Sequence, residues 1–280
     1  MFRLVRPVFQ SLARHMRLGS SGNTSEPMPL IPNDIDLDDP AVDTTRDFCG
    51  NSLFVEDARA DYTKAFARVM EYAAYEQLPG DVMEFGTYSG FTARILAEAM
   101  IKYGKTGPML LFDSFAGFPA SPNKADNESL KVAVQGYWKA GGMNVPPGLD
   151  RHIAERLGPV LGKDRLQVHQ GMFETTMRQA IQGKKSAIVH IDCDLYASTK
   201  YVLETLYLND CLQDGGVLLF DDFFCNRANP NFGEQAALQI FLAMQRRFTV
   251  SPWFTYSWAA AAFFLHDTSA QNQSGATLTR

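Results

Sequence analysis

Apolar residues recur along most of this chain at two alternating spacings. Between residues 61 and 77 they keep the three- and four-residue spacing of an amphipathic helix, at Tyr62, Phe66, Val69, Met70, Ala73 and Ala74. A short apolar run follows at 82–86 and ends at a glycine, which is the pattern of a buried strand. The sequence therefore predicts a helix that packs against a sheet just ahead of its first strand.

The same alternation continues downstream. Further helices are expected at 91–103, 174–182, 198–211 and about 233–247, and further strands at 109–113, 165–170, 187–192, 216–221, 248–254 and 258–266. Because strands that alternate with helices form mostly parallel sheets, we expect an α/β fold with a Rossmann-like, doubly wound sheet. The two terminal strands have a short link, so they predict an antiparallel hairpin at one edge of that sheet.

The ends of the chain read differently from its middle. Residues 1–24 combine four arginines with scattered apolar residues and carry no acid. This pattern favours a flexible or dimer-packing arm, and a membrane-surface helix, a partner-binding helix or a transit peptide are alternatives. We expect an arm and linker at 1–48, a globular domain at 49–267 and a flexible tail at 268–280. The arm also leads us to expect a homo-oligomer.

The composition excludes several classes of protein. The net charge of −5 over 280 residues argues against a general nucleic-acid binder. The chain has no run of about 18 apolar residues, so no transmembrane helix is expected. Its four cysteines are widely spaced and include no C-x-x-C pair, which is typical of reduced thiols in a cytoplasmic protein.

The turn after the first strand predicts a ligand site. Glycines at 86 and 90 permit a sharp turn and a close approach to a ligand, and the helix that follows offers free N–H groups. Glu84 is an acid inside a buried strand, where a carboxylate needs a partner. The turn lacks the G-x-G-x-x-G spacing of dinucleotide sites, so a nucleoside with an amino-acid tail fits better than a nicotinamide cofactor.

Acids also stand at other strand ends, where ligands bind in such sheets. Asp113 follows the second strand, at the place of an acid that holds a ribose diol. Asp192, Asp221 and Asp222 follow the fourth and fifth strands, and their like charges predict a divalent ion such as Mg²⁺. Asp194 is expected to cap the helix that follows it instead.

Together these segments resemble class I S-adenosylmethionine-dependent methyltransferases, and more narrowly the macrocin/mycinamicin O-methyltransferase family, which acts on sugar hydroxyls of natural products. The motifs that carry the resemblance are Glu84-Phe-Gly-Thr-Tyr-Ser-Gly90, Phe112-Asp-Ser-Phe-Ala-Gly-Phe-Pro119, Gly171-Met-Phe-Glu-Thr-Thr176, His190-Ile-Asp-Cys-Asp-Leu-Tyr-Ala-Ser-Thr199, Gly215-Gly-Val-Leu-Leu-Phe-Asp-Asp222 and Phe232-Gly-Glu-Gln-Ala236. They span roughly residues 60 to 265, and they imply a seven-stranded sheet whose last strand is antiparallel.

The resemblance also implies roles for individual residues. The methionine end of S-adenosylmethionine would lie against Glu84, Gly86, Thr87, Tyr88, Ser89 and Gly90. The ribose would bind Asp113 and Ser114, and the adenine would lie against Gly171, Met172 and Phe173. Asp192, Asp221 and Asp222 would hold Mg²⁺, with Asp192 also at the reacting atoms.

The expected reaction is in-line methyl transfer to an acceptor with vicinal hydroxyls, in a small molecule or glycan such as a sugar or catechol. Lys139 and His152 are the candidates for a general base, and both lie in a long segment, 114–160. That segment is either a lid over the substrate or a helical insert that extends the core. Phe223, Phe224 and Trp253 either line an apolar acceptor pocket or belong to the core.

Two alternatives remain open from the sequence. One is a catechol-type small-molecule O-methyltransferase with the same cofactor. The other is a methyltransferase-like scaffold without catalysis, against which the set of acidic residues argues.

Overall fold

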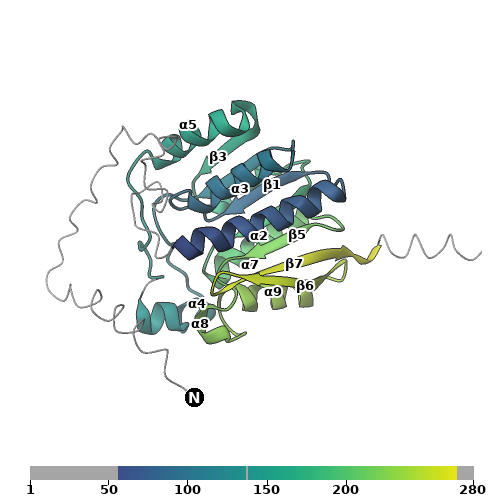
Figure 1. The fold of residues 1–280 in the computed structure, drawn as a ribbon. Helices are drawn as coiled ribbons and strands as arrows, with labels where there is room; N and C mark the ends of the chain where they lie inside the picture. Colours follow the sequence, from purple (N-terminus) through teal and green to yellow (C-terminus); the bar gives the residue numbers. More distant parts are fainter. Residues whose placement is uncertain (1–55, 137, 270–280) are drawn as a thin grey trace, which may run out of the picture. The chain divides into compact units, whose positions relative to one another are not determined.

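The computed structural model describes residues 56–136 and 138–269, so the expected arm at 1–48 and nearly all of the expected tail lie outside them. Within this part the chain forms one seven-stranded sheet with strand order β3-β2-β1-β4-β5-β7-β6 (Figure 1). The strands are β1 (Asp81–Phe85), β2 (Met109–Asp113), β3 (Leu166–Gln170), β4 (Ser186–Ile191), β5 (Val217–Phe220), β6 (Phe248–Tyr256) and β7 (Ala260–Asp267).

The first five strands pair in parallel, and β7 pairs antiparallel with both β5 and β6. The predicted Rossmann-like sheet with an antiparallel last strand is therefore confirmed, and so is the terminal hairpin at one edge. Valine, isoleucine, leucine and phenylalanine dominate β1, β2, β4 and β5, and most of their side chains are fully buried. Such continuous apolar runs are expected where helices cover both faces of a sheet.

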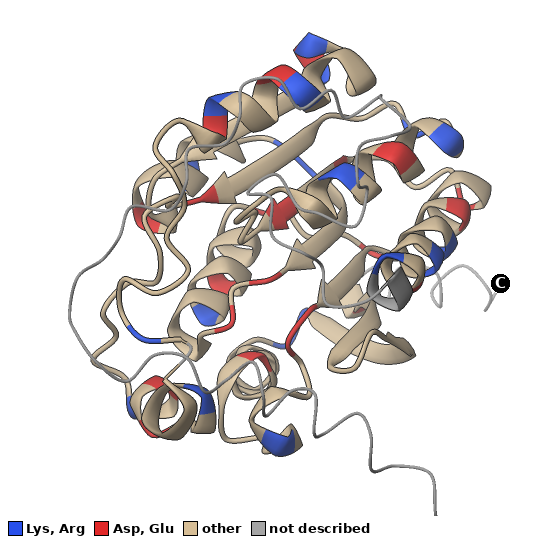
Figure 2. Cartoon of the chain, turned by 60° about the vertical axis from the view of Figure 1, so that its left-hand side comes forward, with Lys and Arg blue, Asp and Glu red and all other residues tan. Residues whose placement is uncertain are grey.

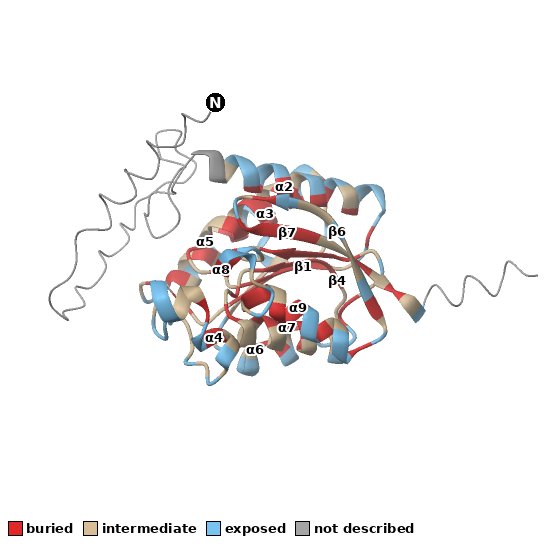
Figure 3. Cartoon of the chain, turned by 90° about the horizontal axis from the view of Figure 1, so that it is seen from below, coloured by how far each residue is buried: buried red, intermediate tan, exposed pale blue. Residues whose placement is uncertain are grey.

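Helices cover both faces (Figure 3). One layer contains α2 (Glu56–Tyr75), α3 (Phe91–Lys102) and α5 (Leu149–Leu161), and the other contains α6 (Phe173–Ala180), α7 (Tyr196–Leu208) and α9 (Gly233–Met244). The apolar positions of α2 that the sequence singled out, such as Phe66 and Met70, are fully buried against the sheet. None of the described helices is long and apolar enough to cross a membrane.

The segment at 114–160 contains α4 (Lys124–Asn127), η1 (Leu130–Gln135), which is a π-helix, and the longer α5. Helix α5 buries Ile153 and Leu157 in the main core, so this part of the segment extends the core as one of the two alternatives expected. The earlier part folds back on itself through a bridge between Ala116 and Asn144. Phe118 and Met143 of that part line the cavity described next.

The order of the parallel strands reverses between β1 and β4: the chain adds β2 and β3 on one side of β1, and then β4 and β5 on the other. Strand β1 pairs with β2 on one side and with β4 on the other. In open α/β sheets ligands bind beyond the carboxyl ends of the strands at such a reversal. Acidic residues gather at these strand ends, as the red segments beyond the arrowheads in Figure 2 show.

Candidate active site

A cavity of about 560 Å³ opens at the carboxyl ends of β1, β2, β4 and β5. Of the residues predicted to bind the cofactor, all but Glu84 and Gly90 line it: Gly86, Thr87, Tyr88, Ser89, Asp113, Ser114, Gly171, Met172 and Phe173. The acids Asp192, Asp194, Asp221 and Asp222 line the same cavity. Residues expected for the cofactor and residues expected for a metal thus share one space.

The glycine turn is built for close contact between β1 and β4. Gly86 has φ +93°, and a Cβ there would lie 1.8 Å from the carbonyl oxygen of Asp192. Only glycine fits this position, because both the conformation and the space exclude a side chain. The turn closes when the Gly90 amide donates to the Thr87 carbonyl at 2.8 Å, and α3 begins at the next residue.

Asp113 holds the turn and the end of β2 together. Its carboxylate accepts the Tyr88 amide at 2.7 Å and the Phe115 amide at 2.6 Å. Burial raises the pKa of Asp113, and these backbone donors oppose the shift. The carboxylate lines the cavity, and its orientation there is set by these backbone donors.

Glu84 does not line the cavity. It is fully buried, and its Oε1 lies 3.0 Å from Nδ1 of His190, which is also fully buried. Burial alone lowers the pKa of His190, but the carboxylates of Asp221 and Glu84 outweigh it and raise this pKa to about 10. The partner that a buried Glu84 requires is therefore a charged histidine, and the expected direct contact with the cofactor is not supported by this position.

Asp221 is held from two sides. The Tyr62 hydroxyl, from α2, donates to its carboxylate oxygens at 2.7 and 2.9 Å. Nε2 of His190 lies 3.7 Å from Asp221 Oδ1, which is an ion-pair distance but not a hydrogen bond. Burial and then Asp221 and Asp192 raise the pKa of the Tyr62 phenol, so Tyr62 acts as a neutral donor.

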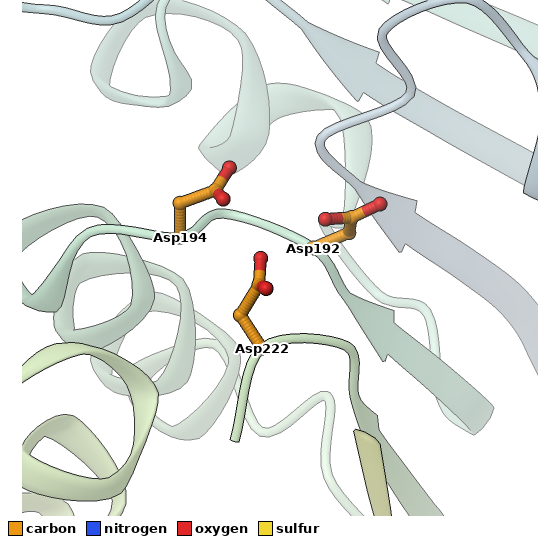
Figure 4. A group of neighbouring side chains, drawn as sticks. All are labelled: Asp192, Asp194 and Asp222. Atoms are coloured by element: carbon orange, nitrogen blue, oxygen red, sulfur yellow. The ribbon is translucent and has the colours of Figure 1, made fainter. Parts of the chain in front are cut away.

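The three carboxylates that lie closest to one another are not the three predicted to bind the metal. Oxygens of Asp192, Asp194 and Asp222 lie within 4.8 Å of one another, and the three side chains turn toward a common space (Figure 4). The structure thus brings together two of the predicted metal residues, Asp192 and Asp222, with Asp194 in place of Asp221. Burial, and then the neighbouring acids, raise the pKa of Asp192 and of Asp194 well above the usual range. A divalent cation would relieve this crowding, and an all-oxygen donor set suits Mg²⁺.

The prediction that Asp194 caps a helix is wrong. Helix α7 begins after Leu195, and the carboxylate that accepts from its first amides belongs to Asp126 of α4. Asp126 Oδ1 accepts the Tyr196 amide at 2.6 Å, and Oδ2 accepts the Ala197 amide at 3.3 Å. Because a residue from the 114–160 segment supplies the cap, Asp194 is left to face the cavity.

Helix α9 supports the loop after β5. The buried Glu234 accepts the Asp222 amide at 3.0 Å, and Gln235 donates to the Phe223 carbonyl at 2.7 Å. Burial and the charge of Asp222 raise the pKa of Glu234 well above its ordinary value. The Phe232–Ala236 motif in the sequence therefore positions Asp222 and Phe223, and none of its residues lines the cavity.

Several predicted residues lie elsewhere. Lys139 is exposed, and His152 lies on α5, the helix that packs against α3 and β3; neither lines the cavity, so the geometry gives no support to either as a general base. Phe223 packs against the core between the sheet and the layer of α6, α7 and α9. Trp253 stacks on Phe264, with 4.3 Å between the ring centroids. Phe224 is partly exposed but also lies outside the cavity lining.

Other lining residues were not predicted. Tyr62 lies on the apolar face of a helix, where a tyrosine reads as core, and the pairing of α2 with the end of β5 joins residues 159 positions apart. Ser257 and Trp258 lie in the link between β6 and β7, whereas the sequence predicts Trp258 as the first residue of the strand 258–266.

Comparison with known proteins agrees with this fold. The family model for macrocin O-methyltransferase (TylF) matches residues 55–243. No curated protein sequence matches the chain. Among solved structures, the calicheamicin methyltransferase CalS11 is 22% identical with a TM-score of 0.59, over 72% of this chain and 77% of that one. The O-methyltransferase NovP is 18% identical with a TM-score of 0.55, over 73% of this chain and 79% of that one.

These two likenesses show the shared fold, and the family model covers more than half of the chain. The chain therefore belongs to the macrocin O-methyltransferase (TylF) family, and the predicted S-adenosylmethionine-dependent O-methyltransferase is confirmed.

Proposed function

We propose that this enzyme methylates a sugar hydroxyl of a natural product or glycan, with the help of Mg²⁺. The observation that carries the proposal is the single cavity that joins the glycine turn of β1 to the acids after β4 and β5. A solved structure with the same fold agrees with a sugar acceptor. CalS11 is described as a TDP-rhamnose 3′-O-methyltransferase, and this apo structure is 20% identical with a TM-score of 0.53, over 76% of this chain and 81% of that one.

The chain's own residues would orient the methyl donor. The glycine turn and the start of α3 present backbone amides at one end of the cavity, where a carboxylate can bind. Asp113 would accept from a ribose diol while its bonds to Tyr88 and Phe115 fix its orientation. Gly171, Met172 and Phe173 form an apolar wall for a flat base. Positioning of this kind accounts for much of the rate of a transfer between bound reactants.

Asp192 and Asp222 would hold Mg²⁺, with Asp194 or Asp221 as the third carboxylate. When bound, such an ion lowers the pKa of a coordinated hydroxyl and orients it. The geometry favours Asp194 as the third ligand, because its oxygens lie with those of Asp192 and Asp222, whereas both oxygens of Asp221 share the proton of the Tyr62 hydroxyl.

Asp192 is the residue that we place at the reacting atoms. It lies where the glycine turn touches the end of β4, between the expected cofactor residues and the acidic group. Burial and neighbouring acids raise its pKa in the metal-free site, and a bound cation would favour the charged carboxylate again.

The test has two stages. Calorimetry with S-adenosylmethionine should give binding at sub-millimolar concentration, and the loaded enzyme should then release S-adenosylhomocysteine with sugar acceptors. Excess EDTA should remove this activity and Mg²⁺ should restore it. Full activity in EDTA would contradict the metal proposal, and turnover with catechols but not with sugars would contradict the proposed acceptor.

A further inference from the structure

We infer that Trp258 is the platform on which the acceptor's sugar ring stacks. The inference rests on the proposed function, because it names the part of the same cavity that receives the sugar. Trp258 is not among the residues predicted for the cofactor, the metal or the general base. It is one of the largest exposed apolar groups of the described chain, at 73% exposure, and yet it lines the cavity.

Trp258 stands at the tip of the hairpin between β6 and β7. Tyr256 pairs with Ala260, so the link contains only Ser257, Trp258 and Ala259. A single exposed apolar residue on a protein surface needs no explanation. Trp258 is not such an isolated case, because it lines the same cavity as five aspartates. It offers a large apolar face beside groups that can bind hydroxyls.

The turn is fixed with respect to the acids. Ala259 is buried in a small cluster with Trp138, Leu195 and Cys225, and its carbonyl accepts the Phe224 amide at 2.8 Å. Leu195 directly follows Asp194. The thiol of Cys225 donates to Asp222 Oδ1 at 2.8 Å. The base of the turn thus packs against both loops that carry the acidic group.

Two further features orient the indole. Ser257 has φ +51°, a left-handed conformation that non-glycine residues adopt at a cost and that often marks functional turns. Lys131 of η1 places its Nζ 5.2 Å from the Trp258 ring and 5.7 Å from the Trp138 ring, within the range of a cation–π contact. Lys131 therefore links the 114–160 segment to the hairpin and acts as a positioning residue for Trp258.

This arrangement suits a particular chemistry. A pyranose presents hydroxyls at its edges and C–H groups on its faces. Its hydroxyls can turn toward Asp192, Asp194 and Asp222 while one C–H face covers the indole, which removes apolar surface of both partners from water. A flat catechol could stack on the same face, so the kinetic test below includes a catechol as a competing acceptor.

The experiment measures steady-state kinetics with two rhamnose probes, TDP-rhamnose and p-nitrophenyl α-L-rhamnopyranoside. They share the sugar and differ in what it is attached to, so they distinguish a sugar nucleotide from a glycoside. A catechol is the competing acceptor. Trp258→Ala should raise KM for the accepted probe about tenfold or more while kcat changes less than about threefold. Trp258→Phe should retain much of the wild-type KM. Binding of S-adenosylmethionine, measured by calorimetry, should stay unchanged in both.

Trp253→Phe is the matched control, because Trp253 is a tryptophan of the same hairpin that lies outside the cavity lining. It should keep the wild-type KM. Lys131→Met should raise KM less than Trp258→Ala does, and Lys131→Arg should restore it, since arginine keeps the cation against the ring. A purely structural role of Lys131 would change thermal stability without this rescue of KM.

The outcomes separate this inference from the proposed function. If the wild type methylates a rhamnose probe and Trp258→Ala keeps its KM, the platform is refuted while the proposed function stands. If the wild type binds S-adenosylmethionine but neither binds nor methylates either probe, and turns over a catechol instead, both fail. A rise in KM of about tenfold in Trp258→Ala and a smaller rise in Lys131→Met, with wild-type KM in Trp253→Phe, supports the platform.

Discussion

The hydroxyl of Tyr62 donates to both carboxylate oxygens of Asp221, at 2.7 and 2.9 Å. This pair joins the first described helix to the end of β5. It continues through His190, whose ring nitrogens lie 3.7 Å from Asp221 and 3.0 Å from Glu84. A line of polar side chains therefore runs beneath the cavity from α2 across β5 and β4 to β1, and it determines how Asp221 is oriented.

Removing the Tyr62 hydroxyl should reduce activity more than stability. Tyr62→Phe loses a bond to a charged partner, which costs about 1.5–3 kcal/mol, and it frees the Asp221 carboxylate to rotate. We expect kcat/KM to fall about tenfold or more while the protein stays folded. Tyr72→Phe is the control, because Tyr72 lies on the same helix and donates to the Gly215 carbonyl at 3.0 Å, away from the cavity. Equal losses of activity in both variants would contradict a specific role for Tyr62.

The buried pair of His190 and Glu84 should make stability depend on pH. The pKa of His190 is raised to about 10 in the folded protein, against about 6.5 in the unfolded chain. The stabilisation is therefore fully present below pH 6.5 and is lost as the pH rises toward 10. Its slope is at most about 1.4 kcal/mol per pH unit.

Urea denaturation of the wild type and of His190→Gln, in EDTA at pH 6, 8 and 9.5, checks this expectation. The variant should be less stable by about 3–5 kcal/mol at pH 6, because Glu84 is left buried without the histidine that it contacts in the wild type. The gap should narrow at pH 9.5. A gap that does not change with pH would mean that His190 is neutral in the folded protein. The double variant Glu84→Gln/His190→Gln is the control, since it removes both charges.

A comparison of two variants identifies the third metal ligand. If Asp194 completes the group with Asp192 and Asp222, Asp194→Asn should weaken Mg²⁺ binding by about tenfold or more, measured by calorimetry. Asp221→Asn should bind Mg²⁺ with nearly wild-type affinity and lose turnover through its contacts with Tyr62 and His190. The reverse ranking would support the set predicted from the sequence, in which Asp221 is the ligand.

The sequence predicted the fold well because alternating apolar runs report burial directly. Most elements begin and end within a few residues of the expected positions, and nearly all expected cofactor residues line one cavity. Turns and strand ends are local features, and in a parallel sheet the carboxyl ends of strands necessarily meet at one edge.

Side-chain partners were much harder to predict, because they depend on contacts between distant segments. Glu84 is predicted to contact the cofactor, but its carboxylate contacts His190 on the neighbouring strand β4 instead. Asp194 lies just before a predicted helix, which is where a capping residue is expected. The sequence does not reveal that Asp126, from a distant segment, caps that helix instead. Lys139 and His152 follow from residue type alone, although the four-residue spacing of Leu149, Ile153 and Leu157 already indicates that His152 lies on a helix that packs on the core.

Asp126 provides a test of that long-range cap. It is buried at 2% exposure, and its carboxylate accepts the first amides of α7 and the Ser121 hydroxyl. Asp126→Asn would turn an amide N–H₂ toward one of these donors, so we expect a loss of about 1–2 kcal/mol in the free energy of unfolding. Because α7 starts directly after the loop that carries Asp192 and Asp194, Mg²⁺ affinity should fall as well.

Asp214→Asn is the comparison for this variant, since Asp214 also accepts a backbone amide, that of Asp267 at 2.7 Å, and it precedes β5 whereas Asp222 follows that strand. It should lose some stability and keep its Mg²⁺ affinity. Thermal denaturation and calorimetry on both variants separate the two effects. If Asp126→Asn loses stability but binds Mg²⁺ as the wild type does, the cap serves the helix alone, and β4 is enough to hold the loop of Asp192 and Asp194 in place.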